Sequence, residues 1–121
     1  MDKVLIVDDN PVLRKILRFH LEQESAWEIC GEAENGQIAI DKVLELRPDL
    51  VILDLAMPVM NGLEAARQIR MIAPQTITVL FTMQSCEGLL PEATAAGIKD
   101  VVSKSAGAGA LLASLKALCR R

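Results

Sequence analysis

Short apolar runs alternate with amphipathic segments along the whole chain, and this alternation restricts the fold more than any other feature. Four of these runs are rich in aliphatic and β-branched residues and too short for a helix, as expected of a buried strand. The run at residues 27–33 is weaker and alternates, more like an edge strand. The segments between the runs carry apolar residues at helical spacing. Strands are therefore predicted at residues 3–7, 27–33, 50–53, 76–81 and 98–102. Five strand–helix units in succession predict an α/β protein with a parallel sheet.

Right-handed crossovers between these units give a doubly wound (βα)5 fold, for which we expect the flavodoxin-like strand order 2-1-3-4-5. The first helix should begin at Asn10-Pro11, a cap residue followed by proline, and run to about Glu24. Pro91 is expected in the first turn of the fourth helix, where proline is tolerated, which leaves residues 83–90 as a loop or frayed turn. The remaining helices are predicted at residues 36–46, 63–72 and 108–118.

The chain has 121 residues and a net charge of −3, and we expect a single domain over residues 1–121 with no output domain. Its basic residues are scattered, which argues against direct binding of nucleic acid. The apolar runs are too short for a membrane span and no signal peptide is visible, so a cytoplasmic protein is expected. Three cysteines without metal-ligand spacing, Cys30, Cys86 and Cys119, indicate reduced thiols.

Acidic residues follow two of the predicted strands directly. Asp8 and Asp9 come after the first run, and Asp54 comes after the third. Because these strands are neighbours in the expected order and end at the same edge, the three carboxylates should meet there. Acids about 4 Å apart repel by roughly 4 kcal/mol per pair at an effective dielectric of about 20. A hard divalent cation would relieve this repulsion, so a metal pocket is predicted. Capping of the first helix by one tandem acid is the simpler alternative.

Two further polar residues follow the last two strands. Thr82 comes after the fourth strand, and Lys104 comes shortly after the fifth. At the same edge as the acids, their hydroxyl and ammonium groups could hold phosphoryl oxygens that a cation attracts. Asp54 would then be central, with an oxygen free to attack phosphorus as a nucleophile. Taken singly, both residues would be ordinary surface side chains.

These residues together make the chain resemble the receiver domain of bacterial response regulators, a CheY-like domain, over nearly its whole length. The resemblance is carried by VLIVDDNP at residues 4–11, DLVILDLAMP at 49–58, NGLE at 61–64, Thr82 and Lys104. Two further segments, GEAENG at 31–36 and RPD at 47–49, resemble the receivers of two-component regulators with LuxR/NarL-type DNA-binding domains.

The resemblance implies a phosphoacceptor and a metal site. Asp54 is implied to receive phosphate from a phosphohistidine on a sensor histidine kinase or a histidine phosphotransfer protein. Asp9, Asp54 and the main-chain carbonyl of Ala56 are implied as direct ligands of Mg²⁺. Asp8 is implied to act mainly through water or by orienting the metal shell. Mg²⁺ prefers hard oxygen ligands, few of them from protein, which agrees with this set.

The resemblance also implies how the signal is passed on. Lys104 is implied to pair with Asp54 and later with the phosphoryl group, while Thr82 moves toward a phosphoryl oxygen. The domain would be a signalling module without turnover of a free substrate. Phosphorylation would alter the face of the fourth helix, fifth strand and fifth helix, and so change protein interactions or transcription. That face, or the first and fifth helices, would bind a partner or a second copy of the chain.

Four positions depart from the usual receiver pattern. Val101 stands where many receivers have an aromatic residue, so no aromatic rotamer can report phosphorylation. Met83 replaces a small residue and is expected to crowd access to the phosphoacceptor. Ala56 has no side chain to steer an attacking water, whereas Gln84 has one. Ser105 replaces a common proline, so a cis bond before it would cost about 3 kcal/mol.

Two other functions remain open from the sequence. A haloacid-dehalogenase-like phosphatase also uses an aspartate nucleophile and Mg²⁺, but it needs a second acid two residues later, where this chain has Ala56. A degenerate receiver would act through protein contacts without phosphorylation. The complete set of acids, hydroxyl and lysine argues against the degenerate form, whereas Val101 and Met83 favour it.

Overall fold

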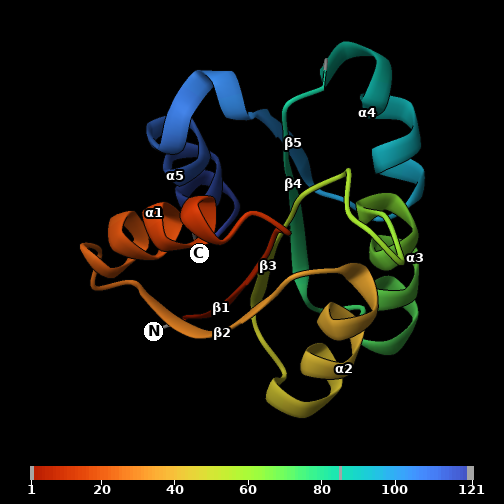
Figure 1. Ribbon diagram of the computed structural model, residues 1–121, viewed down its shortest axis with the longest axis horizontal. Helices are drawn as coiled ribbons and strands as arrows, with labels where there is room; N and C mark the ends of the chain where they lie inside the picture. Colours follow the sequence, from red (N-terminus) through yellow and green to blue (C-terminus); the bar gives the residue numbers. More distant parts are fainter. Residues whose placement is uncertain (1, 85, 120–121) are drawn as a thin grey trace.

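A five-stranded parallel sheet forms the centre of the molecule (Figure 1). The computed structural model describes residues 2–84 and 86–119. The strands are β1 (Asp2–Val7), β2 (Trp27–Ala33), β3 (Leu50–Leu53), β4 (Ile77–Thr82) and β5 (Asp100–Ser103). Their order is β2-β1-β3-β4-β5, and each neighbouring pair is parallel. The doubly wound α/β fold with flavodoxin-like strand order is therefore confirmed.

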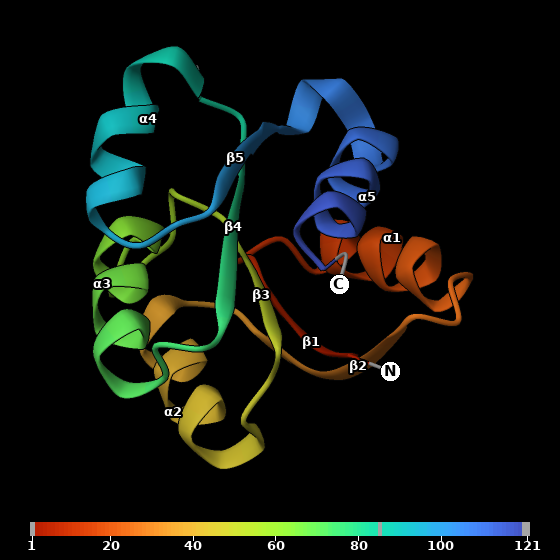
Figure 2. The same ribbon diagram turned by 180° about the vertical axis from the view of Figure 1, so that it is seen from behind.

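Helices cover both faces of this sheet (Figures 1 and 2). The helices α1 (Pro11–Glu22) and α5 (Gly107–Leu118) pack on one face. The other face carries α2 (Gly36–Leu46), α3 (Gly62–Ile72) and α4 (Cys86–Ala95). A short 3-10 turn, η1 (Lys104–Ala106), joins β5 to α5. Within the part of the chain that the structure describes, no helix is long and apolar enough to cross a membrane.

The central strands are held by apolar layers on both sides. Along β1, Val4 and Ile6 pack toward α1 and α5, whereas Leu5 and Val7 pack toward the other three helices. This alternation follows from the pleat of a strand. All four residues of β3 are at most 1% exposed. Burial of each such aliphatic side chain contributes about 1.5–3 kcal/mol to the stability of the fold. These layers therefore hold β1 and β3 in place, and with them the residues at which the two strands end.

Asparagine caps α1, α2 and α3, the helices that follow β1, β2 and β3. The side-chain oxygens of Asn10, Asn35 and Asn61 each accept a bond from a main-chain N–H in the first turn, at 2.9–3.3 Å. Such a cap stabilises a helix by about 1 kcal/mol. The caps of α1 and α3 also set where the loops after β1 and β3 end. The helix α1 ends at Glu22, two residues before the predicted end.

The prediction for the fourth helix was wrong. The helix α4 begins at Cys86, so Pro91 lies inside it and much of the predicted 83–90 loop is helical. Proline there lacks the N–H that would donate to the carbonyl of Glu87, four residues back. Leu89 packs on the core, whereas Leu90 is 51% exposed.

Candidate functional site

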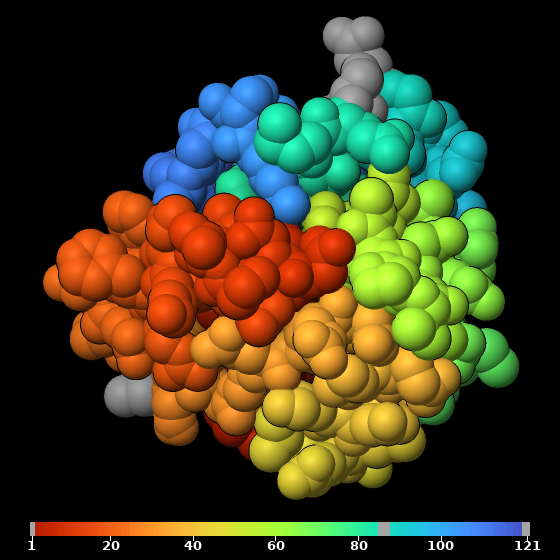
Figure 3. All heavy atoms as spheres, in the orientation of Figure 1, coloured from red at the N-terminus to blue at the C-terminus, as the bar shows by residue number. Residues whose placement is uncertain are grey.

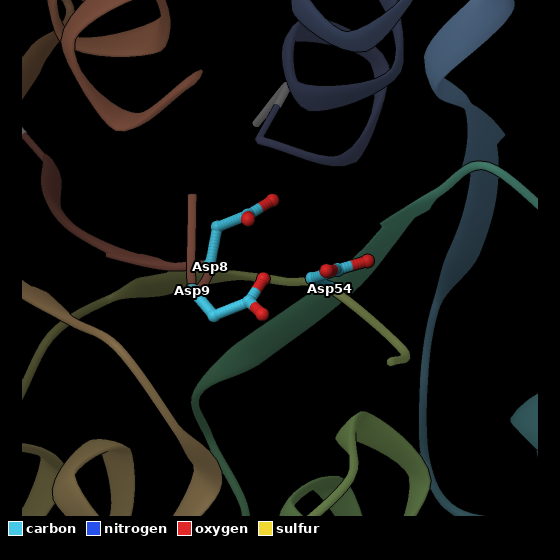
Figure 4. Close-up of side chains that lie close together, drawn as sticks. All are labelled: Asp8, Asp9 and Asp54. Atoms are coloured by element: carbon cyan, nitrogen blue, oxygen red, sulfur yellow. The ribbon is translucent and has the colours of Figure 1, made fainter. Parts of the chain in front are cut away.

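The loops after β1 and β3 bring three carboxylates together. Val7 and Leu53, the last residues of these strands, are direct neighbours in the sheet. The N–H of Asp54 donates to the carbonyl of Val7 at 2.9 Å, which ties the start of one loop to the end of β1. Asp8, Asp9 and Asp54 each offer a carboxylate oxygen, and these oxygens lie within 4.8 Å of one another (Figure 4). The structure thus brings together the three acids that the sequence places at this edge.

Lys104 lies among these acids. Its Nζ atom is 2.8 Å from Oδ2 of Asp8 and 3.3 Å from Oδ1 of Asp54. The two acids are buried, while Asp9 is exposed. The ammonium therefore bridges the buried pair and offsets its repulsion, and the contact with Asp8 is the shorter of the two. One carboxylate, that of Asp9, stays open to solvent.

Burial and neighbouring charges shift the pKa values of Asp54 and Lys104. Burial raises the pKa of Asp54 above its ordinary value of 3.8, the charge of Asp8 raises it further, and Lys104 only partly opposes both. Burial by itself would lower the pKa of Lys104, but its hydrogen bond to Asp8 and the charges of both acids outweigh burial and raise that pKa. Lys104 is therefore held as a cation. The Asp54 anion lies in surroundings that favour an added positive charge.

Thr82 ends β4 on the same edge of the sheet. It pairs with Ser103, the last residue of β5, and is 1% exposed. Its Oγ1 accepts a hydrogen bond from the N–H of Gln84 at 3.2 Å. A hydroxyl that accepts one bond can still donate its own proton, so Thr82 can bind an anionic oxygen. The next residue, Met83, is 72% exposed beside this strand end.

The start of α3 packs directly against the main chain of Asp54. A Cβ on Gly62 would lie 2.2 Å from the carbonyl oxygen of Asp54. The N–H of Gly62 donates to the carbonyl of Leu55 at 2.8 Å. Only glycine allows so close an approach of two main-chain segments. The Asn61-Gly62 pair, part of the NGLE motif at residues 61–64, thus holds the main chain of the candidate phosphoacceptor.

The middle of the loop between β3 and α3 is exposed and includes a strained residue. Val59 is 81% exposed and has a φ of 69°, which is rare for a β-branched residue. Around it, the N–H of Met60 donates to the carbonyl of Pro58 at 2.7 Å, closing a tight turn. Ala56 is exposed in the same loop. Its carbonyl as a metal ligand stays a prediction.

The departures at Val101 and Ser105 have structural consequences. Val101 is buried in the cluster on the α2–α4 side, so its position holds a small apolar side chain and no aromatic ring. The Lys104–Ser105 peptide bond is trans, so the chain avoids the cis bond that a proline would have favoured. The N–H of Ser105 instead donates to Oγ of Ser103 at 3.2 Å and begins η1.

The donor set suits a hard divalent cation. Three carboxylate oxygens lie within 4.8 Å of one another, and one of these acids is open to solvent. When all three are ionised, three negative charges against the single Lys104 ammonium leave a net charge of −2. Mg²⁺ takes oxygen ligands and keeps several positions for water or phosphate oxygens. The residues present therefore fit Mg²⁺.

Two contacts beside the acids were not predicted from the sequence. Arg14 of α1 donates from Nη1 to the carbonyl of Asp8 at 2.6 Å, and from Nε to Oε1 of Glu32 at 2.9 Å. In the sequence Arg14 is one of several scattered basic residues. The only available signal was its place, one turn into the helix that directly follows the tandem acids.

Comparison with known proteins shows the family. The family model of the response regulator receiver domain matches residues 4–116, so the chain belongs to this family. Transcriptional regulatory protein YdfI of Bacillus subtilis is 38% identical over 120 residues, which cover 99% of this chain and 56% of YdfI. Chemotaxis protein CheY of Thermotoga maritima is 37% identical over 102 residues, which cover 84% of each chain.

A solved structure agrees with this assignment. A two-component response regulator of the LuxR family from Aurantimonas has a TM-score of 0.92 at 29% identity, covering 98% of this chain and 84% of that one. The chain is a receiver domain of two-component signalling, whose family function is phosphorylation on aspartate. Receiver domains bind Mg²⁺ at an acidic pocket and interact with histidine kinases or phosphotransfer proteins. The chain spans little more than half the length of YdfI.

Proposed function

We propose that Asp54 is the phosphoacceptor of this receiver domain and that Mg²⁺ is its cofactor. The observation that carries the proposal is the convergence of Asp8, Asp9 and Asp54, two of which, Asp8 and Asp54, contact the Lys104 ammonium. Asp54 is the central member, because it directly follows β3, the strand between β1 and β4, and also contacts Lys104. Its main chain is also packed closely against Gly62 at the start of α3, which restricts its movement.

The transfer step needs an oxygen nucleophile and positive groups that neutralise the charge on the phosphoryl oxygens. A carboxylate oxygen of Asp54 attacks the phosphorus of a phosphohistidine on the donor protein. The P–O bond forms while the P–N bond breaks, and the electron pair of the broken bond stays on the imidazole nitrogen, which takes up a proton. Lys104 binds one phosphoryl oxygen and the hydroxyl of Thr82 donates to another. Phosphoryl transfer depends mainly on positioning and charge neutralisation, which these groups supply.

The metal would be held on the Asp9 side of the cluster. Asp9, Asp54 and the carbonyl of Ala56 would bind Mg²⁺ directly, and Asp8 would act through water. In support, the Asp9 carboxylate is exposed and has no ion pair or hydrogen bond among the residues that the structure describes. When bound, the ion neutralises charge on the transferring phosphoryl oxygens. Asp8 is already paired with Lys104 at 2.8 Å, which suits it to an indirect role.

A donor protein that reaches Asp54 must cover the loops after β1, β3 and β4. Figure 3 shows the red, yellow-green and teal segments that contain these loops gathered on one face beside α1. On α1, Val12, Ile16 and Phe19 are 63%, 45% and 62% exposed. Their spacing places them on one side of the helix. We infer that this apolar stripe contacts the histidine kinase or phosphotransfer protein.

The output of the switch would be a changed surface. Phosphorylation would draw the hydroxyl of Thr82 toward the phosphoryl group and shift the adjoining α4–β5–α5 face. With Val101 in place of an aromatic residue, the change would pass through Thr82 and the main chain. The exposed side chains of Met83 and Leu90 give this region apolar surface for a partner or a second copy. The likeness to YdfI, a transcriptional regulatory protein, supports a transcriptional output.

The proposal is tested by incubating the protein with Mg²⁺ and acetyl phosphate and measuring its intact mass. The wild type should gain one phosphoryl group only when Mg²⁺ is present, and Asp54→Asn should gain none. Asp49→Asn is the matched control, because Asp49 is also an acid beside β3 but lies at its opposite end, exposed and bound to the N–H of Lys3. It should be phosphorylated like the wild type.

The same experiment separates the alternatives. A folded wild-type protein that gains no mass would contradict the proposal and favour an interaction module that works without phosphorylation. Continuous release of phosphate from a free phosphomonoester would instead indicate a phosphatase. The exposed Ala56, in the position where such a phosphatase needs an acid, argues against that second outcome.

A further inference from the structure

The side chain of Arg14 reaches back from α1 to the loop that carries the tandem acids. Its Nη1 donates to the main-chain carbonyl of Asp8 at 2.6 Å. Its Nε donates to Oε1 of Glu32 on β2 at 2.9 Å. Only 18% of the side chain is exposed. One guanidinium thus joins the end of β1, the helix α1 and the neighbouring strand β2.

Glu32 is held by two arginines. Its Oε1 accepts from Arg14 and its Oε2 accepts from Nε of Arg18, both at 2.9 Å. Burial would raise the pKa of Glu32, but the hydrogen bonds and charges of Arg18 and Arg14 outweigh it and lower that pKa. Glu32 therefore stays ionised and orients the Arg14 guanidinium. Arg18, in contrast, has a further acid partner in Glu22, at 3.6 Å.

The carbonyl that Arg14 binds belongs to the peptide group between Asp8 and Asp9. Rotation of this peptide would redirect the side chain of Asp9. That side chain has no hydrogen bond or ion pair among the described residues that would hold it in place. The other hydrogen bonds of Asp8 involve its N–H, in the preceding peptide group, or its carboxylate. Its N–H donates to the carbonyl of Ala33 at 3.0 Å, and its Oδ1 accepts from the N–H of Asn10 at 2.9 Å. The bond from Arg14 is therefore the contact best placed to set the direction of Asp9.

We propose that Arg14, oriented by Glu32, is a positioning residue that sets the Asp8–Asp9 peptide so that both acids face the cation. This inference rests on the proposed Mg²⁺ site. The residue must be arginine, because two N–H groups in one planar fork bind a carbonyl and a carboxylate at once. Lysine offers a single ammonium at the end of a flexible stem and cannot make both contacts with the same geometry.

Positioning and simple charge predict opposite effects on metal binding when Arg14 is removed. By charge alone, loss of a cation beside an acidic cluster strengthens the binding of Mg²⁺. By positioning, the loss releases the Asp8–Asp9 peptide and weakens binding, since partners of metal ligands typically contribute about 10- to 100-fold in affinity. The sign of the change therefore separates the two roles.

The test is a Mg²⁺ titration of the wild type, Arg14→Met, Arg14→Lys, Glu32→Gln and Arg18→Met by isothermal titration calorimetry. Urea unfolding followed by Trp27 fluorescence would show that each variant is folded. We expect Arg14→Met to weaken Mg²⁺ binding by about tenfold or more, with smaller losses for Arg14→Lys and Glu32→Gln. Arg18→Met removes the same charge from the same network without touching Asp8, and its affinity should stay within about twofold of the wild type.

NMR supplies a readout that does not depend on activity. In the metal-free protein, the amide resonances of Asp9 and Asn10 should shift in Arg14→Met and stay in place in Arg18→Met. A folded Arg14→Met that binds Mg²⁺ as tightly as the wild type, or more tightly, would overturn the inference. If Arg14→Met fails to fold, wild-type affinity in both Arg14→Lys and Glu32→Gln would overturn it. A wild type that binds no Mg²⁺ would instead refute the proposed function.

Discussion

The close packing of Gly62 on Asp54 predicts that Gly62→Ala damages both stability and phosphorylation. The added Cβ would lie 2.2 Å from the carbonyl oxygen of Asp54, whereas real Cβ atoms keep at least 3.0 Å, so the two segments must separate by 0.8 Å or more. This shift strains the bond from the N–H of Gly62 to the carbonyl of Leu55. Overpacking of about 1–3 kcal/mol and a lost hydrogen bond of about 1 kcal/mol give a destabilisation of about 2–4 kcal/mol.

The same shift acts on the phosphoacceptor. A displacement of about 1 Å in a reacting group can slow a reaction by about 100-fold. Phosphorylation of Gly62→Ala by acetyl phosphate should therefore slow by about 10- to 100-fold, measured by intact mass against time at saturating Mg²⁺. Stability would be measured by urea unfolding, with the fluorescence of Trp27, which is 4% exposed, as the probe.

Gly109→Ala is the matched control for this change. Gly109 lies in α5, and an added Cβ there would meet nothing within 4 Å. Alanine in a helix is favoured over glycine by about 0.5–1 kcal/mol, so this variant should be at least as stable as the wild type and equally reactive. If Gly62→Ala matched Gly109→Ala in both stability and rate, the proposed packing of α3 on Asp54 would be refuted.

Three further changes have expected outcomes. Asp54→Asn should raise stability in Mg²⁺-free buffer at pH 7, because the pKa of Asp54 is raised in the folded protein and its ionisation therefore destabilises the fold as pH rises above 3.8. In urea unfolding, the gain should disappear well below pH 4. Lys104→Met should destabilise by about 3–5 kcal/mol at pH 7, since it leaves the buried Asp8 and Asp54 without a counter-charge. A loss that did not shrink in acid would contradict this cause. Val59→Gly should stabilise by about 1 kcal/mol by relieving a φ of 69° at an exposed side chain, and an unchanged urea midpoint would argue against strain there.

Much of the fold follows from patterns that act locally. The apolar runs end directly before Asp8 and Asp54, so strand ends and site residues could be predicted together from the sequence. The asparagine that caps α1 was equally visible, because capping depends on a few adjacent residues. Pro91 shows the limit of such local rules. A proline normally marks a helix start, but here an exposed helix tolerates the missing bond one turn further on.

The contacts that the sequence did not reveal depend on distances between segments far apart in the chain. Gly62 is needed because α3 approaches the main chain of Asp54, and no sequence pattern encodes that distance. Arg14 and Glu32 are 18 residues apart and meet only because α1 crosses beside β2. The pairing of Lys104 with Asp8 as well as Asp54 also depends on the packed geometry at the ends of β1 and β5. Residue types were predictable, and their partners were not.

The most direct test of the central claim is to locate the phosphoryl group. The protein is treated with Mg²⁺ and acetyl phosphate, reduced with borohydride, which converts an aspartyl phosphate to homoserine, and sequenced by tandem mass spectrometry. We predict homoserine at Asp54 alone, and none when Mg²⁺ is omitted. Homoserine at Asp8, Asp9 or Asp49 with Asp54 unmodified would contradict the account.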